Sequence, residues 1–145
     1  PPVDVLPCLS RVMNAGIGEG RTRPEHRVIA DQLYALYARG RSLRQLVTVI
    51  GEAALSDSER RVLTFADAFE QRLVGQGRAR RTLDESFDVA WDILAGLPDE
   101  QLTRIPAHVL ARYRSSTVRD TAAEEEPAAA SDQEPAATAD QEPAP

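Results

Sequence analysis

The clearest helical pattern in this chain is Val62-Leu63-Thr64-Phe65-Ala66-Asp67-Ala68-Phe69-Glu70-Gln71-Arg72-Leu73. Its apolar side chains recur at the i, i+4, i+7 and i+11 positions that form one face of an α-helix: Val62, Ala66, Phe69 and Leu73. The following segment repeats this spacing: Leu83, Phe87, Ala90 and Leu94. Because each helix must bury its apolar face, the two matching faces predict two helices that pack antiparallel across a loop at 75–81.

Signals for helix starts and ends surround this pair. A capping box places a hydroxyl residue three positions before Glu or Gln, and this spacing occurs at four places: Thr22/Glu25, Ser42/Gln45, Ser56/Glu59 and Thr82/Glu85. Gly40, Gly51 and Gly96 are typical of positions just past a helix end. These signals predict helices over about 23–39 and 43–50, a brief helix after Pro98, and a last turn or two after Pro106. The expected fold is all-α, a small bundle of five or six crossed helices over residues 21–113.

The two ends of the chain differ from this helical part. Residues 1–6 alternate apolar and polar side chains between prolines, which predicts a short extended segment belonging to a sheet encoded upstream, because no other strand is expected here. From Asp120 onward there are eight acidic residues and no basic one, in a background of Ala and Pro. Residues 114–145 are therefore predicted to be a disordered acidic tail. The formal net charge of −6 divides into −8 for that tail and +2 for residues 1–119, which hold 17 Arg and 23 − 8 = 15 acids.

The composition excludes several kinds of site. All 17 basic residues are Arg, so no lysine is present for a Walker A loop. One cysteine and two histidines give no disulfide and no zinc-ligand spacing. The basic group Arg78, Arg80 and Arg81 lacks interleaved aromatic residues, so we expect a solvated loop rather than contact with nucleic acid. We also expect a first-turn surface position for His26, a core or interface position for Trp91 and a small buried thiol at Cys8.

One arginine stands out by its position. Arg11 follows Leu9-Ser10 and precedes the glycine-rich run Gly16-Ile17-Gly18-Glu19-Gly20, which places it on an irregular loop beside the bundle. A guanidinium on a loop can fork onto phosphate oxygens, as an arginine finger does. The alternative is a surface arginine paired with Glu19 or another carboxylate. The glycine run is G-x-G-x-G rather than G-x-G-x-x-G, so we interpret it as a flexible turn into the first helix and not as a phosphate cradle.

The chain resembles the B subunit of the V/A-type rotary ATPases. The resemblance rests on Pro2 to Pro7, Leu9-Ser10-Arg11, Gly16 to Gly20, Thr22-Arg23 with His26, and Gln32 to Ala35, and it continues in register to Leu102-Thr103-Arg104-Ile105. It covers about residues 1–113. Departures are Cys8, where serine is usual, the segment Arg78-Ala79-Arg80, and the acidic tail.

The resemblance implies a function for the parent protein. The B subunit of that family is the non-catalytic partner of the catalytic A subunit in an alternating hexameric ring, where ATP hydrolysis or synthesis is coupled through central stalk subunits to proton or sodium transport. It implies that residues 1–20 end an upstream α/β nucleotide-binding domain and that Arg11 reaches, in trans, the nucleotide held by the A subunit. ATP or ADP with Mg would lie at that interface, with no cofactor held by this segment.

The resemblance also implies where the complex lies and what this chain does alone. We expect a cytoplasmic complex peripheral to the membrane, which the chain meets only indirectly, and no ATP hydrolysis by this segment alone. The alternative is a free-standing helical interaction module with an acidic tail.

Overall fold

The computed structural model describes residues 3–8, 10 and 12–124, and their regular structure is entirely helical. This confirms the all-α class. The α-helices are α1 (Met13–Gly16), α2 (His26–Ile50), α3 (Asp57–Ala68), α4 (Leu83–Ala95) and α5 (Ala107–Glu124). Two 3-10 turns, η1 (Glu52–Ala54) and η3 (Asp99–Gln101), and a π-helical segment, η2 (Phe69–Val74), complete the elements.

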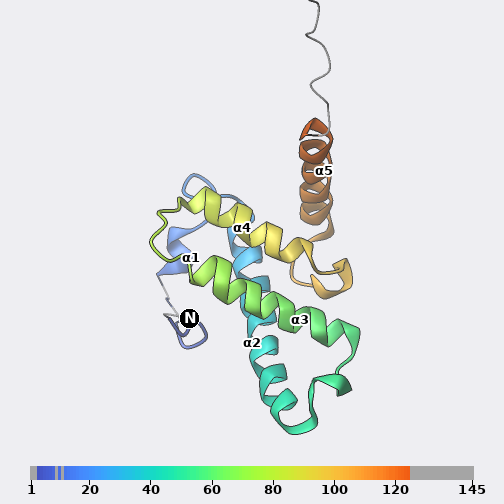
Figure 1. Cartoon of the computed structure of the whole chain (residues 1–145). Helices are drawn as coiled ribbons and strands as arrows, with labels where there is room; N and C mark the ends of the chain where they lie inside the picture. Colours follow the sequence, from blue (N-terminus) through green and yellow to red (C-terminus); the bar gives the residue numbers. More distant parts are fainter. Residues whose placement is uncertain (1–2, 9, 11, 125–145) are drawn as a thin grey trace, which may run out of the picture.

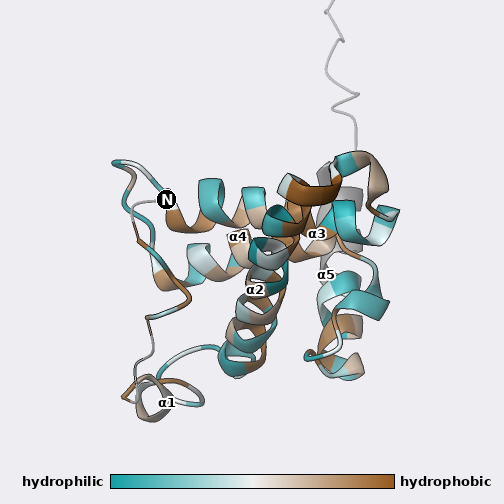
Figure 2. Cartoon of the chain, turned by 90° about the horizontal axis from the view of Figure 1, so that it is seen from below, coloured by the Kyte–Doolittle hydropathy of each residue, from teal (hydrophilic) through white to brown (hydrophobic). Residues whose placement is uncertain are grey.

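The core forms where α2 crosses the pair α3 and α4. Figure 1 shows α3 and α4 side by side and running in opposite directions, as the repeated apolar spacing predicts, with α2 passing across them. Hydrophobic and hydrophilic residues share each of these helices (Figure 2), and the hydrophobic ones supply the core. Six of the eight predicted stripe residues are buried: Val62, Ala66, Phe69, Phe87, Ala90 and Leu94. Leu83 is 49% exposed because it is the first residue of α4, at the end of the hairpin.

The predicted break near Gly40 is wrong, because α2 runs unbroken from His26 to Ile50. Gly40 is buried in the middle of this helix, and a Cβ built on it would lie 2.6 Å from the Cβ of Ala66. The missing side chain lets α2 approach α3 closely, so this glycine serves packing and not helix termination. The two predicted helices are therefore one, which reduces the count from the five or six expected.

Two of the four predicted capping boxes form. Ser56 accepts from the backbone N–H of Glu59 at 3.3 Å, and the Glu59 carboxylate accepts from the Ser56 N–H at 2.9 Å. Thr82 and Glu85 form the same reciprocal pair at the start of α4. The Ser42 box is wrong because Ser42 lies inside α2 and donates to the Ala38 carbonyl. The Thr22 box is wrong because α2 begins at His26, and no side chain caps its N-cap residue Glu25.

The end of α4 and the last helix largely follow the sequence. Gly96 is the C-cap of α4, and Pro98 precedes η3, as expected. Trp91 is buried and stacks on Tyr113 of α5 with ring centroids 4.2 Å apart, which confirms its core position. However, α5 continues to Glu124 and so extends into the predicted tail. Arg114 shows why the boundary near 113 is too early, since it donates to Asp99 at 3.0 Å and holds α5 against η3. The rest of the predicted tail, residues 125–145, lies outside the described residues.

The segment before α1 is not a strand where it is described. Residues 3–8 form bends and a turn in which the Cys8 N–H donates to the Val5 carbonyl at 3.1 Å. The membership of this segment in an upstream sheet stays a prediction. Cys8 is exposed, so the expectation of a buried thiol is wrong; its Sγ donates to the Asp4 carbonyl.

Candidate functional site

The candidate site is the loop that carries Arg11. Arg11 itself lies outside the described residues, as does Leu9, so the site is built from their neighbours. Ser10 and Val12 are both exposed, and Val12 is 76% exposed despite its apolar side chain. Met13, which opens the single turn of α1, is also exposed. The described residues on both sides of position 11 therefore face solvent, at the edge of the molecule where Figure 2 shows α1 set apart from the packed helices.

The glycine-rich run after α1 forms a compact turn. Gly18 and Gly20 have φ values of 109° and 78°, a backbone region that residues with a Cβ rarely adopt. The Thr22 N–H donates to the Gly18 carbonyl at 2.8 Å, and the Gly18 N–H donates to the Thr22 hydroxyl oxygen at 2.8 Å. The Arg21 guanidinium donates to the Ala15 carbonyl and so links this turn to α1. The interpretation of these glycines as turn residues is confirmed.

His26 fixes this turn to the start of α2. Its Nδ1 lies 3.1 Å from the Thr22 hydroxyl oxygen, and its ring packs edge-on against Phe87 of α4 with centroids 4.8 Å apart. Burial against these neighbours lowers the pKa of His26 below its ordinary value of 6.5. The first-turn position is as predicted, but the ring is half-buried and not a surface group.

The chain before position 11 is attached to the same helix. The Tyr34 hydroxyl donates to the Leu6 carbonyl at 2.6 Å, and Arg41 donates to the Asp4 carboxylate at 3.3 Å. Val5 and Leu6 are half-buried and pack against the core. The segment thus lies along α2, with Asp4 toward the middle of the helix and Leu6 nearer its start.

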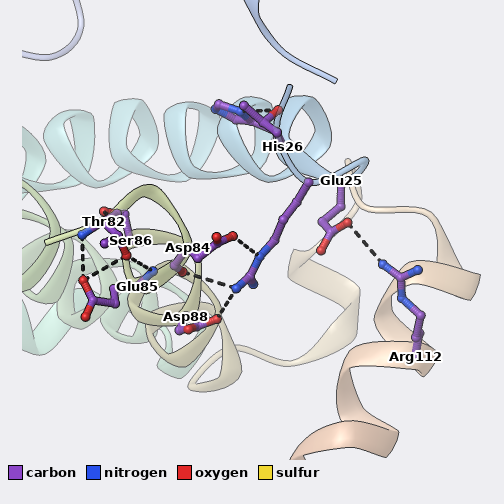
Figure 3. Close-up of polar contacts among 10 residues, drawn as sticks. Glu25, His26, Thr82, Asp84, Glu85, Ser86, Asp88 and Arg112 are labelled. Atoms are coloured by element: carbon purple, nitrogen blue, oxygen red, sulfur yellow. Dashed lines mark hydrogen bonds and ion pairs between the residues drawn. The ribbon is translucent and has the colours of Figure 1, made fainter. Parts of the chain in front are cut away.

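Arg23, just before α2, was missed as a structural residue by sequence reasoning. Its guanidinium lies 2.9 Å from Asp84 and 2.9 Å from Asp88, and 5.4 Å from the centre of the Phe87 ring. Figure 3 shows both carboxylates turned toward that guanidinium, and Glu25 paired with Arg112 of α5. A usable signal was the i, i+4 spacing of Asp84 and Asp88, which puts two carboxylates on one face of α4. These contacts attach the base of the loop to α4 and α5.

The loop at 75–81 is solvated only in part. Arg78 and Arg80 are exposed, as predicted. The expectation is wrong for Arg81, which donates to the carbonyls of Arg72 and Leu73, each at 2.7 Å, and to the Ser86 hydroxyl. It satisfies carbonyls at the end of η2, where the helical hydrogen bonds run out.

Among the described residues, no cluster of His, Cys, Asp and Glu is arranged to hold a metal ion, and no helix is long and apolar enough to cross a membrane. The chemistry available is therefore that of arginine side chains presented on a supported loop.

Residues 15–114 match the family described as the C-terminal domain of V and A type ATP synthase. The chain belongs to this family. Among curated relatives, the V-type ATP synthase beta chain of Anaeromyxobacter sp. (strain Fw109-5) is 54% identical over 119 residues, which are 82% of this chain and 26% of the relative. The first of the B subunits named for the A-type ATP synthase of Methanospirillum hungatei JF-1 is 52% identical over 114 residues, which are 78% of this chain and 25% of the relative.

A solved structure of the family has the same fold. It is the ATP synthase subunit NeqB from Nanoarcheaum equitans, which is 34% identical, with a TM-score of 0.60 over 68% of this chain and 24% of that one. The chain therefore spans about a quarter of the length of the relatives it matches. The resemblance to the B subunit inferred from the sequence is confirmed.

Proposed function

We propose that this chain is the C-terminal part of a non-catalytic B subunit and that Arg11 acts in trans on the nucleotide held by an adjacent catalytic A subunit. The observation that carries the proposal is the identity of 54% and 52% to relatives named as the beta chain of a V-type ATP synthase and as a B subunit of an A-type ATP synthase. The parent complex would couple ATP hydrolysis or synthesis to proton or sodium transport. No observation on the described residues favours the free-standing module instead.

The chemistry of the proposed site follows from the side chain. A guanidinium is planar and always charged, and it can give two parallel hydrogen bonds to phosphate oxygens, where negative charge develops as the phosphoryl group is transferred. ATP or ADP with Mg would be bound at the interface by the A subunit. The exposure of Ser10 and Val12 supports this role, because a residue between them can be reached by a neighbouring protein in the ring.

The proposed partners are the catalytic A subunit, in an alternating hexameric ring, and the central stalk subunits. The far end of α2 supports a contact with a partner, since it leaves Leu46, Val49 and Ile50 exposed, Val49 by 81%. Exposed apolar side chains that gather on one surface are typical of interaction sites. Through the complex, the chain would be cytoplasmic and peripheral to the membrane, with no direct contact with the bilayer.

The test is substitution of Arg11 in the intact B subunit, with the ring assembled from it and its A partner. We expect Arg11→Ala to lower ATP turnover by roughly 10³- to 10⁵-fold, the range for loss of an arginine finger. Arg11→Lys should not restore it, because an ammonium cannot reproduce the fork. Arg78→Ala, on an exposed loop, is the matched control and should keep wild-type turnover. Native mass must show that the rings still assemble, and wild-type turnover in both Arg11 variants would contradict the proposal.

A further inference from the structure

One face of α2 holds the chain on both sides of position 11. His26, Tyr34 and Arg41 are about two helical turns apart in succession, a spacing that keeps all three on one side of the helix. Arg41 and Tyr34 contact Asp4 and Leu6, before position 11, whereas His26 contacts Thr22, after it. The Arg11 loop, residues 9–20, thus leaves this face and returns to it.

We propose that Thr22 and Tyr34 are positioning residues for the Arg11 loop. The proposal rests on the function proposed above for Arg11. Neither side chain would touch the nucleotide. Each acts through a hydrogen bond that fixes the loop to the first half of α2: Thr22 at the Gly18 turn, and Tyr34 at the Leu6 carbonyl.

Thr22 closes the loop through a relay of polar groups. Its hydroxyl oxygen accepts from the Gly18 N–H, which leaves the hydroxyl hydrogen able to point to Nδ1 of His26, 3.1 Å away. His26 is in turn held by Phe87, and the neighbouring Arg23 by Asp84 and Asp88. The Gly18 turn is therefore tied through one hydroxyl to groups that are themselves fixed to α4. Replacing that hydroxyl by a methyl group removes the partner of Gly18 and preserves the shape of the side chain.

Tyr34 holds the other side of the loop with its hydroxyl alone. Its ring is 37% exposed, so it is not a core residue, while its hydroxyl reaches the Leu6 carbonyl at 2.6 Å. Tyr34→Phe deletes this bond and little else. A group that stabilises a transition state must be held close to its productive position, and a misplacement of about 1 Å can lower the rate roughly 100-fold. Loosening one of two attachments should have a smaller effect than deleting the guanidinium.

The experiment compares Thr22→Val and Tyr34→Phe in the intact B subunit, with the ring assembled from it and its A partner. We expect each to lower kcat for ATP hydrolysis about 10-fold with little change in KM, because the nucleotide is bound by the other protein. Hydrogen exchange of peptides covering residues 12–20 should become faster. Thr22→Ser, which keeps the hydroxyl, should restore both properties. Thr64→Val, which removes an exposed hydroxyl that bonds only within α3, is the matched control and should change neither.

The decisive comparison uses the Arg11→Ala background. If Thr22 acts only by positioning Arg11, the double variant Arg11→Ala/Thr22→Val is no slower than Arg11→Ala alone. A further 10-fold loss in the double variant would overturn the proposal, as would wild-type kcat in both Thr22→Val and Tyr34→Phe. If Arg11→Ala itself keeps wild-type turnover, the proposed function fails as well, so the two failures are distinguishable.

Discussion

At the scale of single residues, His26 lies where three parts of the molecule meet. It begins α2, its ring packs against Phe87 of α4, and its Nδ1 faces the Thr22 hydroxyl of the Arg11 loop. A protonated imidazole carries a hydrogen on both nitrogens, so it can no longer accept a hydrogen bond from Thr22. The charge state of His26 therefore bears on the stability of the molecule and on the attachment of the loop.

We expect the free energy of unfolding to fall as the pH is lowered from about 7 to 5. Burial lowers the pKa of His26 in the folded chain, so below about pH 6.5 the unfolded chain binds this proton more readily than the folded one. The contribution is fully present above the unfolded pKa and is lost as the pH falls toward the folded value. Thermal unfolding at a series of pH values measures it.

The control for this prediction is His26→Asn, which should flatten the dependence of unfolding temperature on pH between 7 and 5. Glu59, Glu70 and Glu85 do not interfere in this range, because their pKa values are lowered from 4.5 by hydrogen bonds to Ser56, Arg44 and Thr82 and they titrate at more acidic pH. Equal slopes for the variant and the wild type would contradict the assignment to His26.

Single residues were predicted from sequence only where local pattern determines their position. Trp91 follows the apolar spacing of its helix and is buried as expected. Cys8 carries no such pattern, and its exposure depends on how the segment before α1 turns. Arg23 and Arg81 act through contacts with residues on other elements, which a local motif does not encode.

At the scale of elements, the capping boxes separate local preference from tertiary context. Ser56 and Thr82 follow turns, so their hydroxyls meet free N–H groups at a true helix start. Ser42 has the same sequence spacing but lies inside α2, where the N–H groups are already used by the helix. The motif was therefore reliable only where the chain also ends the preceding element, and Gly40 did not end it because its missing Cβ is needed against α3.

We expect Ser56→Ala to lower the stability of the chain by about 1 kcal/mol, the usual cost of removing an N-cap hydroxyl. Ser42→Ala is the matched control, and it should leave stability unchanged or raise it slightly, since Ala is the better residue inside a helix. Chemical denaturation of both variants provides the measurement. A loss of stability in Ser42→Ala equal to that in Ser56→Ala would mean that a helix does begin at Ser42.

At the scale of the whole molecule, the crossing of α2 over α3 sets the arrangement of the bundle. Gly40 and Ala66 form the closest approach, and Arg44 of α2 adds an ion pair to Glu70 at 2.7 Å, beside the Tyr37 hydroxyl. The all-α class and the antiparallel pair were predictable because they follow from the spacing of apolar residues. The crossing was not, because it depends on a contact between residues far apart in the sequence.

Gly40→Ala should destabilise the chain even though alanine favours helices. The added methyl group would lie 2.6 Å from the Ala66 Cβ, and such overpacking costs about 1–3 kcal/mol, against a gain of up to about 1 kcal/mol in helix propensity. Ala66→Gly should partly rescue it by removing the opposing methyl group, so the double variant should be more stable than the sum of the single effects. Denaturation of the four proteins tests this, and simple additivity would contradict a direct clash.

The unbroken course of α2 has a mechanical consequence. Its 25 residues span about 37 Å, from the attachment of the Arg11 loop to the exposed Val49 and Ile50. With no hinge along that length, the helix is a rigid rod resting on α3 at Gly40 as on a fulcrum. Any force applied at the apolar tip must tilt the opposite end, and the loop attached there moves with it.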